Sequence, residues 1–142
     1  MLEMVCVMAI VALLAAILLP RIPHGTTRPQ LEAYAVQIAA LFKSDRNAAL
    51  LGRGPVAVEV VAADRAVRSG SSGRIVRVPE DVVFEALLPE RCAGQPALST
   101  ISFFATGMSC GGTVRLTRAE NWFEVRVNWL TGGIDIVARD RL

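Results

Sequence analysis

The hydrophobic pattern divides the chain into three parts, and the first is a nearly uninterrupted apolar run. Met4–Leu19 holds no charged or strongly polar side chain, and Pro20 and Pro23 follow it. As a helix, this run would cover about 24 Å of a hydrocarbon layer ~30 Å thick, slightly less than a full span. We therefore predict a transmembrane N-terminal helix over residues 1–23, with a helix break at Pro20.

Two other interpretations of the apolar run fit less well. A secretory signal peptide has basic residues before its apolar region and a small-residue cleavage site after it, and this chain has neither. A buried core helix of such uniform hydrophobicity would need a larger domain around it. The nearest basic residues, Arg21 and Arg28, follow the run. Taken literally, the positive-inside rule leaves the globular part in the cytoplasm, unless a basic leader precedes this sequence.

A single carboxylate, Glu3, lies at the head of the apolar run. An ionised group within a membrane costs about 2.5–3.5 kcal/mol near the centre of a helix, and less near its end. A charge in that position usually has a functional partner. We therefore expect Glu3 to have one.

The second part of the chain has the spacing of an amphipathic helix. Thr27 is a candidate N-cap, and Pro29 suits the first turn. Two glycines and a proline in 52–55 should end the helix. The sequence therefore predicts an amphipathic continuation helix and linker over residues 24–54, packed on its own domain. Apolar residues recur there every three or four positions, at Leu31, Tyr34, Ala35, Ile38, Leu41, Phe42, Ala49 and Leu50.

The third part, residues 55–142, changes to the alternating period of β-strands. In its clearest strand, 122–129, Phe123, Val125, Val127 and Trp129 should face one side and Glu124 the other. Residues 69–73 suggest a flexible turn, and 88–96 an irregular stretch. We predict an α+β protein with an antiparallel β-sheet or β-sandwich domain behind its helices. The other expected strands are 56–60, 75–78, 82–84, 101–104, 114–116 and 134–137.

Composition and charge bound the size and partners of the protein. With 142 residues, the chain can form one compact domain plus an appended segment. The mean hydropathy of +0.45 is largely explained by the first twenty or so residues. The net charge is +2, and basic and acidic residues are interspersed. No face is therefore expected to attract nucleic acid strongly.

Residues capable of covalent or metal chemistry are few. Cys6 lies in the apolar run, whereas Cys92 and Cys110 are compatible either with a disulfide in an oxidising compartment or with two buried thiols. A lone His24 and the absence of a Cys-x-x-Cys motif leave a zinc site without support. Ser109 fits a tight turn better than a nucleophile loop. The sequence predicts no catalytic, cofactor-binding or metal-binding residues.

The N-terminal residues resemble the start of a type IV pilin or a type II secretion pseudopilin. The resemblance lies in Leu2-Glu3-Met4, the apolar helix and Pro20. Mature chains of that superfamily begin Phe-Thr-Leu-Leu-Glu, after a basic leader that a prepilin peptidase removes before methylating the new amino terminus. Met1 stands in the place of the first leucine. The resemblance implies that the leader and the first mature residues are missing from this sequence.

The C-terminal half narrows the resemblance to one branch. Residues 103–116 are similar to the F-x-x-x-G-x-x-x-G-G-x-x-x-L segment of general secretion pathway protein H and related FimT-like minor pilins. Residues 129–134 match the closing Thr-Gly-x-hydrophobic turn of the same group. The chain thus resembles the GspH/FimT-like family over nearly its whole length.

This resemblance implies a structural subunit and not an enzyme. It implies a minor pseudopilin of the type II secretion system, held in the inner membrane by a single helix, with its C-terminal domain in the periplasm. Its partners would be other major and minor pseudopilins, the inner-membrane assembly platform and the lipid bilayer, with no cofactor and no nucleic acid. Glu3 would meet the positively charged amino terminus of a neighbouring subunit.

Two alternatives have different functions. The first is a FimT-like minor pilin of a type IV pilus, with a role in DNA uptake, which requires a basic surface. Arg139 and Arg141 in the C-terminal tail are weak support for such a surface. The second is a membrane-anchored enzyme, for which the sequence offers no convergent acid–base pair.

Overall fold

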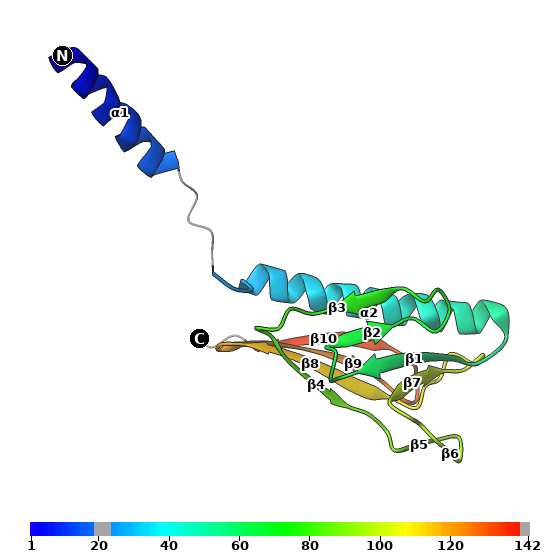
Figure 1. Ribbon diagram of the computed structural model, residues 1–142. Helices are drawn as coiled ribbons and strands as arrows, with labels where there is room; N and C mark the ends of the chain where they lie inside the picture. The colour runs from blue at the N-terminus through cyan, green and yellow to red at the C-terminus, as the bar shows by residue number, and fades with distance from the viewer. Residues whose placement is uncertain (19–23, 140–142) are drawn as a thin grey trace.

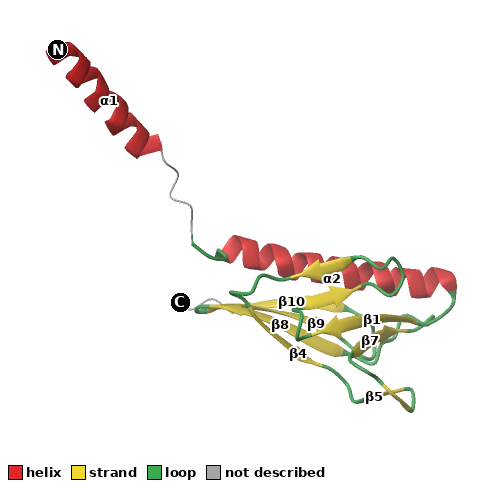
Figure 2. Cartoon of the chain, in the orientation of Figure 1, coloured by secondary structure: helices red, strands yellow, loops and turns green. Residues whose placement is uncertain are grey.

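A computed structural model describes residues 1–18 and 24–139 of the chain (Figure 1). Two helices, α1 (Leu2–Leu18) and α2 (Arg28–Gly52), precede a series of strands (Figure 2). The described strands are β1 (Val56–Val61), β2 (Ala66–Arg68), β3 (Ile75–Arg77), β4 (Val83–Leu87), β5 (Arg91–Cys92), β6 (Gln95–Pro96), β7 (Thr100–Phe103), β8 (Gly112–Arg118), β9 (Asn121–Val127) and β10 (Ile134–Arg139).

Helix α1 has 17 residues and none of them is buried. It lies apart from the β-rich domain (Figure 1). Over residues 1–18 and 24–139, no helix has both the length and the hydropathy required to cross a membrane. The predicted helix break at Pro20 lies outside the described residues.

Helix α2 begins and ends where its sequence signals predict. The Thr27 Oγ1 accepts a hydrogen bond from the Gln30 backbone N–H at 3.4 Å, and the Gln30 Oε1 accepts one from the Thr27 N–H at 3.0 Å. This reciprocal capping box satisfies two backbone donors that the helix itself cannot. After Gly52, the chain leaves the helix through Arg53, whose φ of 51° lies in the left-handed region.

The strands form two four-stranded antiparallel sheets and a small hairpin. The order is β3-β2-β1-β7 in one sheet and β10-β9-β8-β4 in the other, and β5 pairs with β6. Helix α2 packs against strands of both sheets, chiefly β9, β1 and β10. Its apolar stripe supplies Leu31, Ile38 and Phe42 to a core shared by the helix and both sheets. This packing makes the region from α2 onward one body.

Several local predictions are wrong in detail. Trp129 does not continue the buried face of β9, which ends at Val127; its side chain is 62% exposed in the following turn. Strand β2 and the β5–β6 hairpin were not predicted, because segments of two or three residues are too short to show a clear period. The predicted flexible turn at 69–73 is instead tied to α2, as described below.

Candidate assembly site

The first feature suited to assembly is the surface of α1. Its large apolar side chains are at least 52% exposed, and they surround the helix on every side. Burying such a surface is favourable by about 25 cal/mol per Å² of apolar area removed from water. A fully apolar helix exposed in this way needs lipid or other apolar helices around it.

Glu3 lies in the first turn of α1, as its sequence position implies. A carboxylate there interacts favourably with the positive end of the helix dipole. Its own helix supplies no side chain of opposite charge, because α1 contains no basic residue. Glu3 is therefore the one charged side chain of α1, and α1 itself does not neutralise it. The structure does not bring it together with Cys92 or Cys110.

The segment that leads into α2 is fastened by Asp81. This carboxylate accepts hydrogen bonds from the Thr26 backbone N–H at 2.6 Å, the Thr26 Oγ1 at 2.8 Å and the Arg118 Nε at 3.0 Å. These contacts, led by the backbone hydrogen bond from Thr26, lower the pKa of Asp81. The clamp joins the start of α2 to the β3–β4 connection and the end of β8. It therefore fixes the direction in which the chain enters the domain.

A second fastening lies near the other end of α2. Arg46 donates from Nε to the Gly107 carbonyl and from Nη2 to the Thr131 carbonyl, both at 3.1 Å. Gly132 packs so closely against Gly107 that a Cβ on Gly132 would lie 1.8 Å from the Gly107 oxygen. Both glycines have positive φ, 85° for Gly107 and 67° for Gly132. The glycine-rich segments of the sequence are thus explained by a tight loop–loop contact under Arg46.

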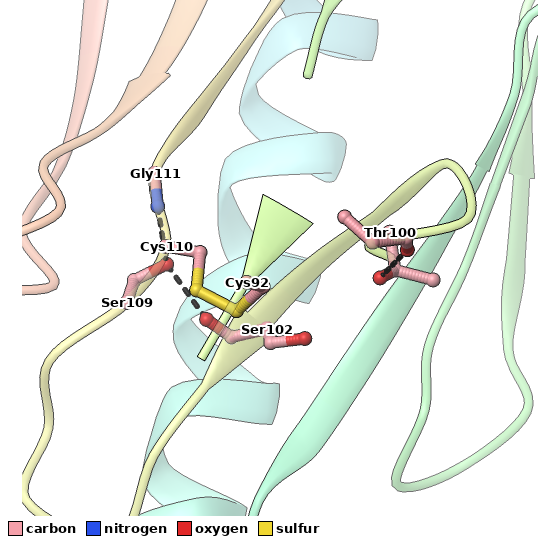
Figure 3. Close-up of a disulfide and its surroundings, with 7 residues drawn as sticks. Cys92, Thr100, Ser102, Ser109, Cys110 and Gly111 are labelled. Carbon is pink, nitrogen blue, oxygen red and sulfur yellow. Dashed lines mark hydrogen bonds between the residues drawn. A yellow bond between two sulfur atoms is a disulfide. The ribbon is translucent and has the colours of Figure 1, made fainter. Parts of the chain in front are cut away.

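The structure joins Cys92 and Cys110 in a disulfide, with Cα atoms 5.7 Å apart (Figure 3). Beside it, the Ser109 Oγ donates to the Ser102 carbonyl at 2.8 Å and accepts from the Gly111 N–H at 3.1 Å. The Ser109 hydroxyl is thus engaged with backbone groups, as befits a residue that shapes a turn. The disulfide secures the β5–β6 hairpin to the segment just before β8.

Sequence reasoning missed Asp45, a fully buried carboxylate on α2. It accepts hydrogen bonds from the Ser69 Oγ at 2.5 Å, the Gly70 N–H at 2.8 Å and the Ser71 Oγ. Its position was a readable signal, since it falls three residues after Phe42, within the apolar stripe. An acid there requires donors from the facing loop.

Glu124 faces away from the core, as predicted, but neighbouring side chains leave its own side chain only 5% exposed. On the outer face of the β10-β9-β8-β4 sheet it accepts from Arg126 and, at 2.8 Å, from the Arg115 Nη2. Arg115 also lies over the ring of Trp122, with its Cζ 5.1 Å from the centroid. The hydrogen bond from Arg126 is the main cause of a lowered Glu124 pKa, partly opposed by burial and reinforced by Arg115. The charges therefore form a local network and not an open basic patch.

The arrangement of these elements defines a pilin-like α+β fold, and solved structures of two proteins share it. The minor pseudopilin EpsH from the type 2 secretion system of Vibrio cholerae matches with a TM-score of 0.60 and 12% identity, over 76% of this chain and 96% of that one. The type IV minor pilin FimU of Pseudomonas aeruginosa matches with a TM-score of 0.57 and 15% identity, over 78% and 90%. A second crystal form of FimU gives a TM-score of 0.53 and 14% identity, over 75% and 92%.

At these identities the likeness establishes the fold. No protein-family model and no curated protein sequence matches the chain. The fold predicted from the sequence, an N-terminal helix followed by antiparallel sheets, is confirmed.

Proposed function

We propose that this protein is a minor pseudopilin, a structural subunit of the type II secretion pseudopilus that helps to export folded proteins across the outer membrane. One observation carries the proposal: a pilin-like domain is joined to an apolar helix that is exposed on all sides and bears Glu3 in its first turn. In this proposal, α1 holds the chain in the inner membrane, and the domain lies in the periplasm. The other pseudopilins and the inner-membrane assembly platform are its partners.

The proposed role of Glu3 follows from the cost of burying a charge. On assembly, α1 leaves the lipid for a core of packed apolar helices, where an unpaired carboxylate is strongly destabilising. The positively charged amino terminus of a neighbouring subunit would neutralise it. Glu3 would then favour entry of a subunit only in the register that brings the two charges together.

The Cys92–Cys110 disulfide supports a periplasmic location for the domain. Disulfides persist in oxidising compartments such as the bacterial periplasm and are rare in the cytosol. A cytoplasmic domain, the literal outcome of the positive-inside rule, would leave this pair reduced.

The likeness to FimU favours a second candidate, a minor pilin of a type IV pilus. A role of that kind in DNA uptake would require a surface that binds phosphates. On the outer face of the β9 sheet, Arg115 and Arg126 are both occupied by Glu124. Glu124 thus offsets part of the positive charge of the two arginines, which favours the secretion role over DNA capture.

Two measurements separate the candidates. Removing the protein from its native host should abolish export of a folded secreted enzyme, and expression of the full chain should restore it. Fluorescence anisotropy with labelled duplex DNA should show no steep loss of affinity between 50 and 200 mM salt, whereas a protein with several phosphate contacts loses about 10³-fold or more. Unchanged export together with such a salt dependence would favour the type IV pilus role instead.

A further inference from the structure

Each four-stranded sheet ends in a short strand with an exposed outer face. In the described residues, β4 ends the sheet β10-β9-β8-β4, and β3 ends the other (Figure 1). Along β4, Val83 is 55% exposed and Leu87 is 77% exposed, with the exposed Glu85 between them. An edge strand presents unpaired backbone N–H and C=O groups, to which another strand can add.

Strand β3 has the complementary chemistry. Ile75 is 45% exposed, and the exposed Arg77 lies on the same face, while Val76 between them is buried in the core. Among the described residues, neither Arg77 nor Glu85 forms an ion pair; the nearby Arg68 pairs with Glu59 instead. The two edges therefore carry unpaired charges of opposite sign, each next to an exposed aliphatic side chain.

The spacing of these residues matches in one antiparallel register. If Glu85 stands opposite Arg77, then Leu87 stands opposite Ile75, because antiparallel partners move by equal steps in opposite directions. Opposite charges and aliphatic pairs directly across two strands are each favourable. Pairing of β4 with a second β4 about Glu85 would instead place two carboxylates opposite each other.

We propose that β4 of one copy of this chain pairs antiparallel with β3 of a second copy, with Glu85 opposite Arg77. Because the two edges differ, the contact is head-to-tail and leaves one free edge at each end of a pair. Such a contact can repeat along an assembly. This inference does not rest on the secretion role, since it requires only the two edges of the folded domain.

In the described residues, β7 and β10 are the other two edges of the four-stranded sheets; β7 has no exposed residue, which leaves β10 as the alternative edge for the second copy. Its outward residues include Val137 and Arg139. The side chain of Val137 is half-buried and is therefore less accessible than that of Ile75. Arg139 lines a hollow with Trp122 and Glu120. The more exposed aliphatic side chain on β3 makes it the better match.

Cysteine crosslinking between two tagged full-length copies tests the pairing. Both copies carry Cys6→Ala; one also carries Leu87→Cys and the other Ile75→Cys, and they are oxidised together in membranes of the expressing cells. We expect a dimer that contains both tags. The matched control replaces Ile75→Cys with Leu98→Cys, which is 83% exposed and lies outside both edges, and should give little dimer.

Charge reversal makes the test specific to the proposed register. Glu85→Arg in the copy with Leu87→Cys, or Arg77→Glu in the copy with Ile75→Cys, should each lower the dimer yield by about fivefold. Both changes together should restore the yield. Glu90→Arg, an exposed acid beyond β4, should leave the yield unchanged. The proposal is overturned if Leu98→Cys or Val137→Cys crosslinks as well as Ile75→Cys does, or if the paired reversals fail to restore the dimer.

Discussion

Among the described glycines, Gly132 leaves the least room for a Cβ atom. Its φ of 67° favours glycine, and a Cβ there would lie 1.8 Å from the Gly107 carbonyl oxygen. Gly73 has nearly the same backbone angle, 73°, but no atom lies within 4 Å of the position that its Cβ would take. Alanine substitutions at Gly132 and Gly73 therefore separate the free-energy cost of a left-handed backbone from that of a steric collision.

We expect Gly132→Ala to lower the free energy of unfolding by about 3 kcal/mol or more, since the loops under Arg46 must move apart. Gly73→Ala should cost only about 1–2 kcal/mol, the strain of a left-handed alanine. Chemical denaturation of the full chain in detergent, followed by tryptophan fluorescence, measures both. Equal losses for the two variants would mean that the close contact contributes nothing.

Glu124 makes the free energy of unfolding depend on pH in the acid range. Its pKa is lowered in the folded state from an ordinary value of 4.5, chiefly by the hydrogen bond from Arg126. The ionised carboxylate therefore stabilises the fold above about pH 4.5, and this contribution is lost as the pH falls through the folded pKa. Glu124→Gln should cost about 1–3 kcal/mol at pH 7, and the difference from wild type should shrink toward pH 3.

Thermal unfolding of the full chain from pH 3 to 7 follows this difference. Glu90→Gln is the matched control, because Glu90 is exposed and lies outside the Arg115–Glu124–Arg126 network. A constant difference between Glu124→Gln and wild type over this pH range would contradict the assigned role of the ion pairs.

At the scale of elements, the Cys92–Cys110 disulfide stabilises a hairpin that has little core of its own. Strands β5 and β6 have two residues each, and none of the four is buried. Closing a loop between cysteines 18 residues apart restricts the unfolded chain. In the chain-entropy account, a loop of this size contributes about 3 kcal/mol.

Replacing both Cys92 and Cys110 with serine should therefore lower the free energy of unfolding by about 2–4 kcal/mol. Denaturation of the wild-type protein with and without reductant provides an independent measurement, and the two losses should agree. The double variant itself should not respond to reductant. An equally stable double variant would show that the hairpin is held by other contacts.

The elements differ in how far the sequence predicts them. Helix α2 is predictable because Thr27, Pro29 and its apolar stripe are local signals that agree with one another. The hydrogen-bond partners of Asp45 and Glu124 are harder to predict, because they lie 24 or more residues away for Asp45 and include a residue of a neighbouring strand for Glu124. Trp129 was misplaced because alternation alone does not show where a strand ends.

The residues of the candidate site also differ in how far the sequence predicts their roles. Glu3 stands out in the sequence because a charge at the head of an apolar run is costly. Arg46 does not, because its role depends on two carbonyls that lie 61 and 85 residues further along the chain. The glycines it secures were visible as a motif, but only the fold explains why they must be glycine.

At the scale of the whole molecule, a stabilised domain is attached to a helix that has no buried residue. The Thr26–Asp81–Arg118 clamp fixes the start of α2, and the Arg46 contacts and the disulfide secure its far end and the adjoining loops. None of the described residues of the domain buries the apolar surface of α1. We therefore expect α1 to find its packing partners in other subunits.

The most direct test of this account uses Cys6, the free cysteine of α1. A benzophenone maleimide attached there in the full chain, in membranes of a host with the complete secretion system, should photo-crosslink to neighbouring pseudopilins. Glu3→Asp should retain much of the crosslinking, whereas Glu3→Leu should abolish it while leaving the amount in the membrane fraction unchanged. Crosslinking that is equally strong with Glu3→Leu would contradict assembly of the subunit through the Glu3 charge.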